Sequence, residues 1–89
     1  MHLGQGQRVI NKGDRVRLDE ILIKAGLERV DLHKLTEAIH QDGGKKPGSK
    51  VKEWIKVNAG KLLSGGVKIG TDVGTKLLTE WLKQYCGIP

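Results

Sequence analysis

Apolar residues recur every three or four positions through most of the chain, and this period is typical of amphipathic α-helices. The first such stripe consists of Leu18, Ile21, Leu22 and Ala25. The second stripe consists of Leu32, Leu35, Ala38 and Ile39. Gly26 can end the first helix in a left-handed conformation, and Asp31 can cap the start of the second. The pattern therefore predicts two short amphipathic helices within residues 19–42.

The same period continues through residues 50–86, the longest amphipathic segment of the chain. One helix over this whole segment would be about 50 Å long, more than a domain of this size accommodates. Its weakest point is Ser64-Gly65-Gly66, because an interior glycine costs about 1 kcal/mol relative to alanine. The segment therefore predicts two helices, Ser49–Leu63 and Val67–Tyr85, that meet at a bend near Gly65.

Residues 1–18 differ from the rest, because two short β-branched runs flank the turn-forming sequence Asn11-Lys12-Gly13-Asp14. Such a pattern favours either an extended arm or a short β-hairpin. Residues 43–49 combine glycine, lysine and proline, and we expect them to link the second helix to the long segment. The prediction for the whole chain is one small, mainly α-helical domain built from these four parts.

Three glycines spaced four apart, Gly66, Gly70 and Gly74, lie on the apolar side of the long segment. On a continuous helix they would line one face and let a second backbone approach closely. The predicted packing surface combines them with the apolar residues of the same face and consists of Gly66, Gly70, Gly74, Trp54, Leu62, Val73, Leu77, Leu78 and Trp81. It could face the protein core, another copy of the chain, or lipid.

Charge favours acidic partners. The 89-residue chain has a formal net charge of +6 and a pI near 9.7, which suits nucleic acid, anionic lipid or an acidic protein surface. Residues 49–89 contain no arginine. Because specific phosphate and base contacts usually depend on the arginine fork, this lysine-rich half is as consistent with a solvated surface as with a binding surface. The expected basic surface consists of Lys52, Lys56, Lys61, Lys68, Lys76 and Lys83.

Residue types that carry catalysis or metal binding are few and scattered. Cys86 is the only cysteine, which excludes an intramolecular disulfide and fits a reducing compartment. His33 and His40 would lie about 10 Å apart along one helix, too far to share a metal ion. The sequence contains no paired acid and base and no phosphate-binding loop motif. We therefore expect no enzymatic activity, no metal and no cofactor.

Neither a secretory signal nor a run of about 20 apolar residues is present, so we expect a cytoplasmic protein, with peripheral membrane association as an alternative. The leading hypothesis is a non-enzymatic protein-interaction or self-assembly module that uses the glycine-lined amphipathic helix. One alternative is a membrane-active, toxin-like effector whose apolar face inserts into lipid or lies flat on it. A second alternative, supported by charge alone, is a basic nucleic-acid-binding protein.

Overall fold

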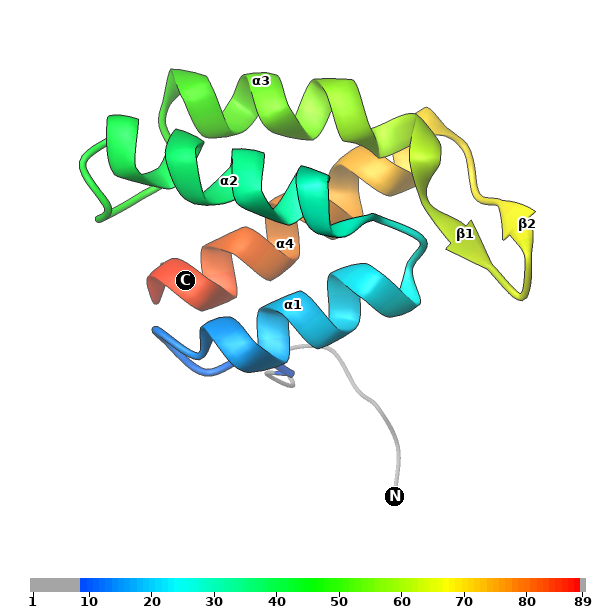
Figure 1. The fold of residues 1–89 in the computed structure, drawn as a ribbon, viewed down its shortest axis with the longest axis horizontal. Helices are drawn as coiled ribbons and strands as arrows, with labels where there is room; N and C mark the ends of the chain where they lie inside the picture. Colours follow the sequence, from blue (N-terminus) through cyan, green and yellow to red (C-terminus); the bar gives the residue numbers. More distant parts are fainter. Residues whose placement is uncertain (1–8, 89) are drawn as a thin grey trace.

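In the computed structural model, residues 9–88 are described and form four α-helices, with a short antiparallel hairpin between the third and the fourth (Figure 1). The helices are α1 (Arg15–Lys24), α2 (Arg29–Gln41), α3 (Ser49–Asn58) and α4 (Thr71–Cys86). The 3₁₀ turn η1 (Ala59–Lys61) extends α3, and the hairpin consists of β1 (Leu63–Ser64) and β2 (Val67–Lys68). The prediction of a mainly α-helical chain is confirmed. Residues 1–8, within the expected N-terminal arm, lie outside the described residues.

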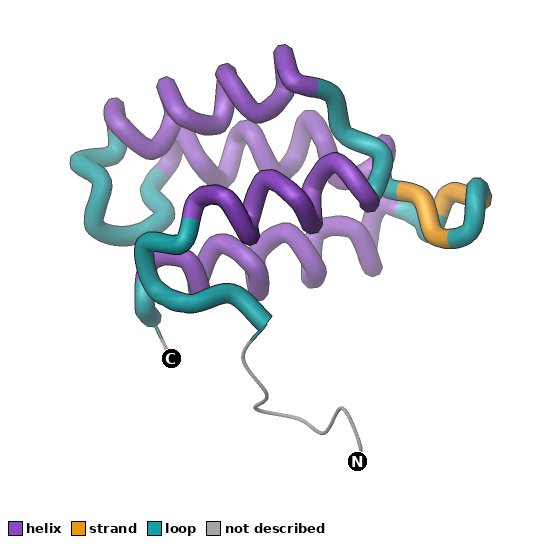
Figure 2. The backbone as a smooth tube through the Cα atoms, turned by 60° about the horizontal axis from the view of Figure 1, so that its bottom comes forward, coloured by secondary structure: helices purple, strands orange, loops and turns teal. Residues whose placement is uncertain are grey.

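Successive helices alternate in direction, so their ends gather at two opposite ends of the molecule (Figure 1). The α2–α3 loop lies at one of these ends, and the hairpin projects from the other (Figures 1 and 2). The four helices and Ile10 share one cluster of buried apolar side chains. This core consists of Ile10, Leu18, Leu22, Leu27, Leu32, Leu35, Ala38, Val51, Trp54, Ile55, Ala59, Leu62, Leu78 and Leu82.

Helices α1 and α2 coincide with the two predicted apolar stripes, and α1 has a defined cap at each end. The Asp14 side chain accepts a hydrogen bond from the Arg17 N–H (3.1 Å) and so caps the start of α1. At the other end, Gly26 has a φ of +106°, and the Leu27 N–H donates to the Leu22 carbonyl (3.0 Å). These features are the Schellman ending that the glycine predicted.

Of the two alternatives predicted for residues 1–18, the short hairpin is wrong where the structure describes the chain. Residues from Arg15 onward belong to α1. The N–H groups of Val9 and Ile10 both donate to the Gln84 Oε1 atom, at 3.0 and 2.9 Å. A side chain of α4 therefore takes the place of a partner strand.

Asp31 is not the N-cap of α2 as predicted, a position that Glu28 takes, but it completes the capping box at the start of this helix and connects three elements. It is the third residue of α2, and its Oδ2 atom accepts a hydrogen bond from the Glu28 N–H (3.0 Å). The Lys61 ammonium lies 3.2 Å from Oδ1, and the Trp54 indole N–H donates to the Asp31 carbonyl (2.9 Å). Burial alone would raise the pKa of Asp31, but the Glu28 N–H and the Lys61 charge outweigh it, so this pKa is lowered. Asp31 thus holds α2 against α3 and η1.

The segment expected as a linker, residues 43–49, is fastened to α2 by Asp42. The Asp42 carboxylate accepts hydrogen bonds from the N–H groups of Gly48, Lys50 and Val51 (2.9, 3.1 and 2.8 Å). These N–H groups lie at the start of α3 and have no partner within the helix, so Asp42 caps this helix. Burial raises the pKa of Asp42, but these N–H donors outweigh it and hold the pKa below its usual value.

Residues 50–86 do not form the expected pair of helices meeting at a bend. Helix α3 ends at Asn58 rather than Leu63, and α4 begins at Thr71 rather than Val67. The η1 turn and the hairpin fill this interval, so the interruption is wider than predicted.

Glycines in left-handed backbone conformations produce this wider interruption. Gly65 and Gly66 have φ values of +59° and +84° in the hairpin turn, and Gly70 has a φ of +91° just before α4. Side chains rarely tolerate these conformations, and a type I′ turn requires positive φ at both of its central residues. Strands β1 and β2 pair across this turn, with Ser64 opposite Val67.

Gly66, Gly70 and Gly74 therefore do not line one helix face, and the predicted glycine seam is wrong as a structure. Of the three, Gly74 alone lies within a helix, where it is buried. A Cβ atom at this position would overlap the carbonyl oxygen of Ala59 in η1. The close backbone approach expected along the whole seam occurs at this one residue, inside the fold.

Candidate functional site

Helix α4 presents three different faces to its surroundings, as the helical period dictates. Three buried residues four positions apart, Gly74, Leu78 and Leu82, form one face, and Gln84 is buried near the end of the helix. The residues one position earlier line a groove between α1 and α4, and they are Val73, Leu77 and Trp81. The residues one position later line a separate cavity against α3, and they are Thr75, Thr79 and Lys83. Two hollows of different chemistry therefore flank this helix.

The hollow between α1 and α4, named here the α1–α4 groove, has a mostly apolar wall. Its volume of about 490 Å³ lies within the range of ligand-binding pockets. It is lined by Arg17, Ile21, Lys24 and Ala25 of α1, by Leu62, Leu63, Ser64 and Ile69 of the hairpin region, and by Val73, Leu77 and Trp81 of α4. Elements far apart in the sequence thus build one surface.

Backbone hydrogen bonds hold the hairpin at the end of this groove. The Leu63 N–H donates to the Ala25 carbonyl at the end of α1 (2.7 Å), and the Ile69 N–H donates to the Leu62 carbonyl (3.2 Å). The space beside Gly26 is also filled by Leu63, whose side chain would lie 3.2 Å from an added Cβ atom. The shape of the groove at this end therefore depends on the turn at Gly26 as well as on the hairpin.

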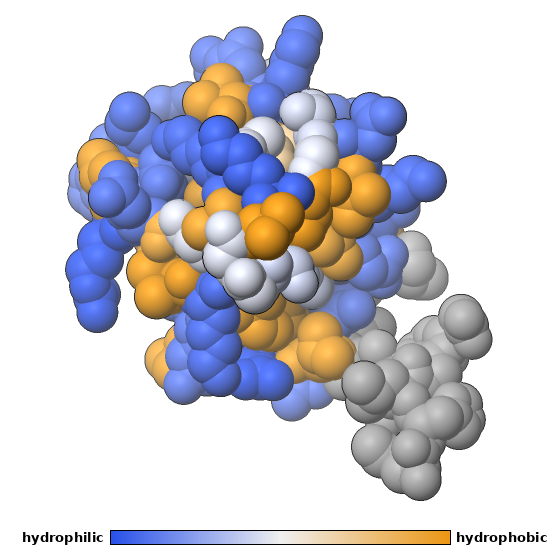
Figure 3. Space-filling view, turned by 90° about the vertical axis from the view of Figure 1, so that its right-hand side faces the viewer, coloured by the Kyte–Doolittle hydropathy of each residue, from blue (hydrophilic) through white to orange (hydrophobic). Residues whose placement is uncertain are grey.

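Several apolar side chains of the groove remain open to solvent. Val73 is 49% exposed and Leu63 is 36% exposed, while Ile69, Leu77 and Trp81 are partly buried. Figure 3 views the hairpin end of the molecule and shows hydrophobic surface gathered there among hydrophilic side chains. Contiguous apolar surface of this kind, rimmed by polar residues, is typical of interaction sites.

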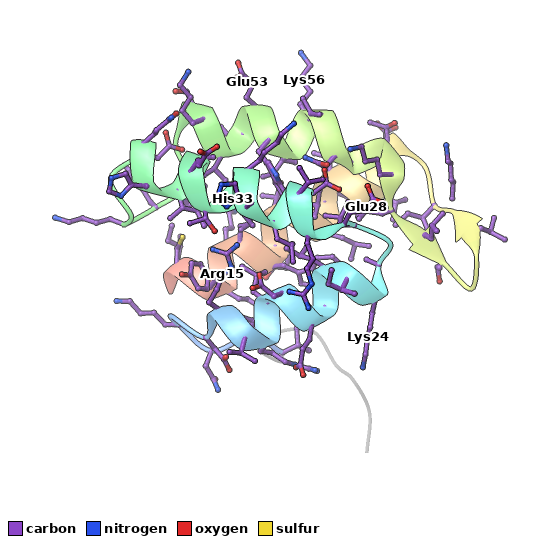
Figure 4. All side chains as sticks on the ribbon, viewed as in Figure 1. Arg15, Lys24, Glu28, His33, Glu53 and Lys56 are labelled. Atoms are coloured by element: carbon purple, nitrogen blue, oxygen red, sulfur yellow. The ribbon has the colours of Figure 1, made fainter. Side chains whose placement is uncertain are left out.

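The charges at the α1–α4 groove are all positive, because Arg17 and Lys24 are the only ionisable residues in its lining. Arg17 Nη1 lies 3.7 Å from Glu20 Oε1, but both groups are well exposed and such a pair is weak. Within residues 9–88, Lys24 has no ion-pair partner, and its side chain extends outward from the last turn of α1 (Figure 4). The rim therefore favours an anionic ligand.

The residues predicted as a packing surface separate into distinct groups in the structure. Four of them meet in the α1–α4 groove: Leu62, Val73, Leu77 and Trp81. Trp54 and Leu78 are core residues with little contact with solvent. Gly66 lies in the hairpin turn, Gly70 directly precedes α4, and Gly74 packs against η1. A binding role for the groove residues stays a prediction.

The predicted basic surface is divided as well. Lys52 and Lys83 line the cavity between α3 and α4, whereas Lys61 pairs with the buried Asp31. The other members, Lys56, Lys68 and Lys76, are exposed. Lys56 points away from the outer face of α3 (Figure 4).

Sequence reasoning missed the part of the groove that α1 and the hairpin supply. Ile21 was assigned only to the apolar stripe of the first helix, and Leu63 and Ile69 were not predicted as part of a packing surface. The sequence does contain one signal for the hairpin. Gly65-Gly66 lies between Leu63-Ser64 and Val67-Lys68, and two glycines between short alternating apolar and polar residues are typical of a two-residue hairpin loop. No local signal connects Ile21 to Trp81, because their proximity follows from the packing of α1 against α4.

Reactive groups are not concentrated in the part of the chain that the structure describes. No group of three His, Cys, Asp or Glu residues there is arranged to hold a metal ion. Burial raises the pKa of the Cys86 thiol, which therefore stays protonated at neutral pH. Within residues 9–88, no helix combines the length and the hydrophobicity needed to cross a bilayer.

Comparisons with protein-family models, curated proteins and solved structures found no match. The function of the protein is therefore inferred from the geometry and charge of its own surface.

Proposed function

We propose that this protein is a non-enzymatic interaction module whose α1–α4 groove binds an amphipathic helix of an acidic partner protein. The observation that carries the proposal is the convergence of apolar side chains from α1, the hairpin and α4 on one open groove with only cations at its rim. Helix-in-groove recognition uses such a surface, because one apolar face of the ligand supplies regularly spaced anchors.

Apolar anchors would supply most of the affinity. Burial of one leucine-sized side chain contributes about 1.5–3 kcal/mol, and two or three anchors can enter a groove of this kind. Association also costs translational and rotational freedom and orders the side chains at the interface. We therefore expect dissociation constants in the micromolar range, equivalent to about 8 kcal/mol of binding free energy.

Charge determines which partner is favoured. The groove lining contains Arg17 and Lys24 but no carboxylate, and the whole chain carries a net charge of +6. A second copy of the chain would bring further positive charge to this rim, whereas glutamates beside the apolar anchors of a ligand would complement it. An acidic partner is therefore favoured over self-association.

The test uses a synthetic helix of about 18 residues with leucines on one face and glutamates on the other. Fluorescence anisotropy of this labelled peptide should show micromolar binding, and a version with lysines in place of glutamates should bind at least about tenfold more weakly. Val73→Glu should weaken binding of the acidic peptide by a similar factor. Val30→Glu is the matched control, because Val30 is 54% exposed and also lies in the first turn of a helix, α2.

Equal affinity of the Val73→Glu and Val30→Glu variants for the acidic peptide would contradict the proposal. Sedimentation of the chain without peptide tests self-association: a dimer that Val73→Glu dissociates would make a second copy the occupant of the groove. Binding to anionic vesicles or to nucleic acid that is lost with Val73→Glu, without any peptide binding, would likewise replace the proposed partner.

A further inference from the structure

The second hollow beside α4 differs from the first in its polar lining. It has a volume of about 610 Å³ and lies between α3, α4 and the segment that precedes α3. Its cationic residues come from all three places: Lys46 from the loop, Lys52 from α3 and Lys83 from α4. Two residues with hydroxyl groups, Thr75 and Thr79, also line it on the α4 side. We name this hollow the α3–α4 cavity.

No carboxylate balances these three lysines. The lining of the α3–α4 cavity contains neither aspartate nor glutamate. Among residues 9–88, Lys46, Lys52 and Lys83 have no ion-pair partner. The hollow between α2 and α3 provides a contrast, because its lysines are accompanied by Asp31, Glu37 and Glu53. Like charges around one concave site raise the local potential for anions, so an anionic ligand would relieve their repulsion.

The threonine hydroxyls add hydrogen-bond donors to the lining of the same cavity. Within the described part of the chain, neither Thr75 nor Thr79 uses its hydroxyl in a hydrogen bond to protein. The N-terminus of α3 also borders this cavity through Gly48, but its N–H groups already bind Asp42. Side chains, rather than the helix terminus, would therefore hold the anion.

The rest of the cavity wall is apolar and is formed by Pro47, Ile55 and Ile88. Such a wall suits a ligand that has a carbon body as well as a charged group. Phosphate is the anion that matches the polar side best, because its oxygens can accept hydrogen bonds from several ammonium and hydroxyl groups at once.

We infer that the α3–α4 cavity binds a phosphate monoester, with the phosphate among Lys46, Lys52 and Lys83 and the carbon body against Ile55 and Ile88. This site lies on the opposite flank of α4 from the α1–α4 groove and does not depend on the proposed peptide binding. The phosphate could belong to a free small molecule or to the headgroup of phosphatidic acid, since both are phosphate monoesters.

The experiment titrates the protein with phenyl phosphate by isothermal titration calorimetry, with inorganic phosphate and phenol as partial ligands. We expect phenyl phosphate to bind more tightly than either partial ligand, because the phosphate and the carbon body contribute separately. The double variant Lys52→Gln/Lys83→Gln should weaken binding at least about tenfold, as loss of charge-assisted hydrogen bonds implies. The matched control Lys56→Gln/Lys76→Gln removes two exposed lysines of the same helices that do not line the cavity.

Vesicles containing phosphatidic acid separate the two sources of the phosphate. Phenyl phosphate binding without vesicle binding assigns the site to a free ester, and vesicle binding that Lys52→Gln/Lys83→Gln abolishes assigns it to a lipid headgroup. Absence of any binding by phenyl phosphate and by vesicles would overturn the inference. Equal losses in the double variant and its control would also overturn it, because the effect would then be general electrostatic attraction.

Discussion

The backbone of Gly74 in α4 lies directly against the carbonyl of Ala59 in η1, so that a Cβ atom at position 74 would overlap the carbonyl oxygen. This contact sets how closely the start of α4 approaches the end of α3. Because Val73 precedes Gly74 and Thr75 follows it, the same contact fixes the flanks of α4 that line the two hollows. One glycine therefore positions both candidate binding surfaces.

Gly74→Ala should destabilise the protein by about 2 kcal/mol or more, because overlap of the new Cβ atom with the Ala59 carbonyl forces α4 to shift. This cost exceeds the gain that alanine brings as a better helix former than glycine. Urea denaturation measures this difference. Gly60→Ala is the control, since its new Cβ atom would lie 3.5 Å from the Thr71 hydroxyl and meet nothing closer. It should change stability by less than about 0.5 kcal/mol. Equal stability of the two variants would show that the Gly74 contact does not constrain α4.

Gln84→Leu should destabilise the protein by about 2 kcal/mol, because the N–H groups of Val9 and Ile10 would lose their acceptor near the core. The Gln84 Nε2 atom also lies 3.4 Å from Glu80 Oε2, so Glu80→Gln is the control that keeps the acceptor of Val9 and Ile10. Urea denaturation of both variants tests the prediction. A leucine variant as stable as the unchanged chain would mean that these bonds contribute nothing to the fold.

Asp42→Asn should lower the melting temperature at neutral pH by several degrees, because a neutral amide accepts hydrogen bonds from the α3 terminus more weakly than a carboxylate. The pKa of Asp42 in the folded protein is lowered by these bonds despite partial burial. Its contribution is therefore present above about pH 4 and is lost as the pH falls through the folded-state pKa. Between neutral and acidic pH, the melting temperature should therefore fall less steeply for Asp42→Asn than for the unchanged chain.

Glu53→Gln is the control for this pH dependence, since Glu53 projects outward from α3 (Figure 4). The melting temperature of this variant should depend on pH in the same way as that of the unchanged chain. Identical pH dependence of the Asp42→Asn variant and the unchanged chain would refute the assigned cap.

Reversal of the rim charges should change the preference of the α1–α4 groove. The double variant Arg17→Glu/Lys24→Glu should bind the acidic helix about tenfold more weakly and the lysine version more tightly, because complementary charge sets specificity. Lys56→Glu, on the outer face of α3, should leave both affinities nearly unchanged. Anisotropy titrations at low and moderate salt measure these affinities. A preference that does not change in the double variant would remove the electrostatic part of the proposal.

Local patterns predicted the first half of the fold well. The stripe from Leu18 to Ala25 and the stop at Gly26 became α1 and its Schellman ending, because both depend on neighbouring residues. The N-terminal hairpin was wrong for the opposite reason: the partner of Val9 and Ile10 is Gln84, at the far end of the sequence. No local sequence pattern predicts a contact between residues so far apart in the chain.

The second half shows how a helical period can persist where no helix forms. Leu62, Gly66 and Gly70 keep the spacing of a helix face, yet both glycines have positive φ and Leu62 is extended. The conformational freedom of glycine outweighed the periodic pattern. The α4 side of the groove, with Val73, Leu77 and Trp81, followed from periodicity, whereas the side formed by α1 and the hairpin required the tertiary structure.

The most direct test of the central claim locates the acidic helix on the protein by NMR. Intermolecular nuclear Overhauser effects should connect its leucine methyl groups to the Trp81 indole and to the Val73 methyl groups, and they should be absent from the buried Trp54. The Val73→Glu variant should lose them under the same conditions. A bound peptide whose leucines contact neither Trp81 nor Val73 would contradict the account.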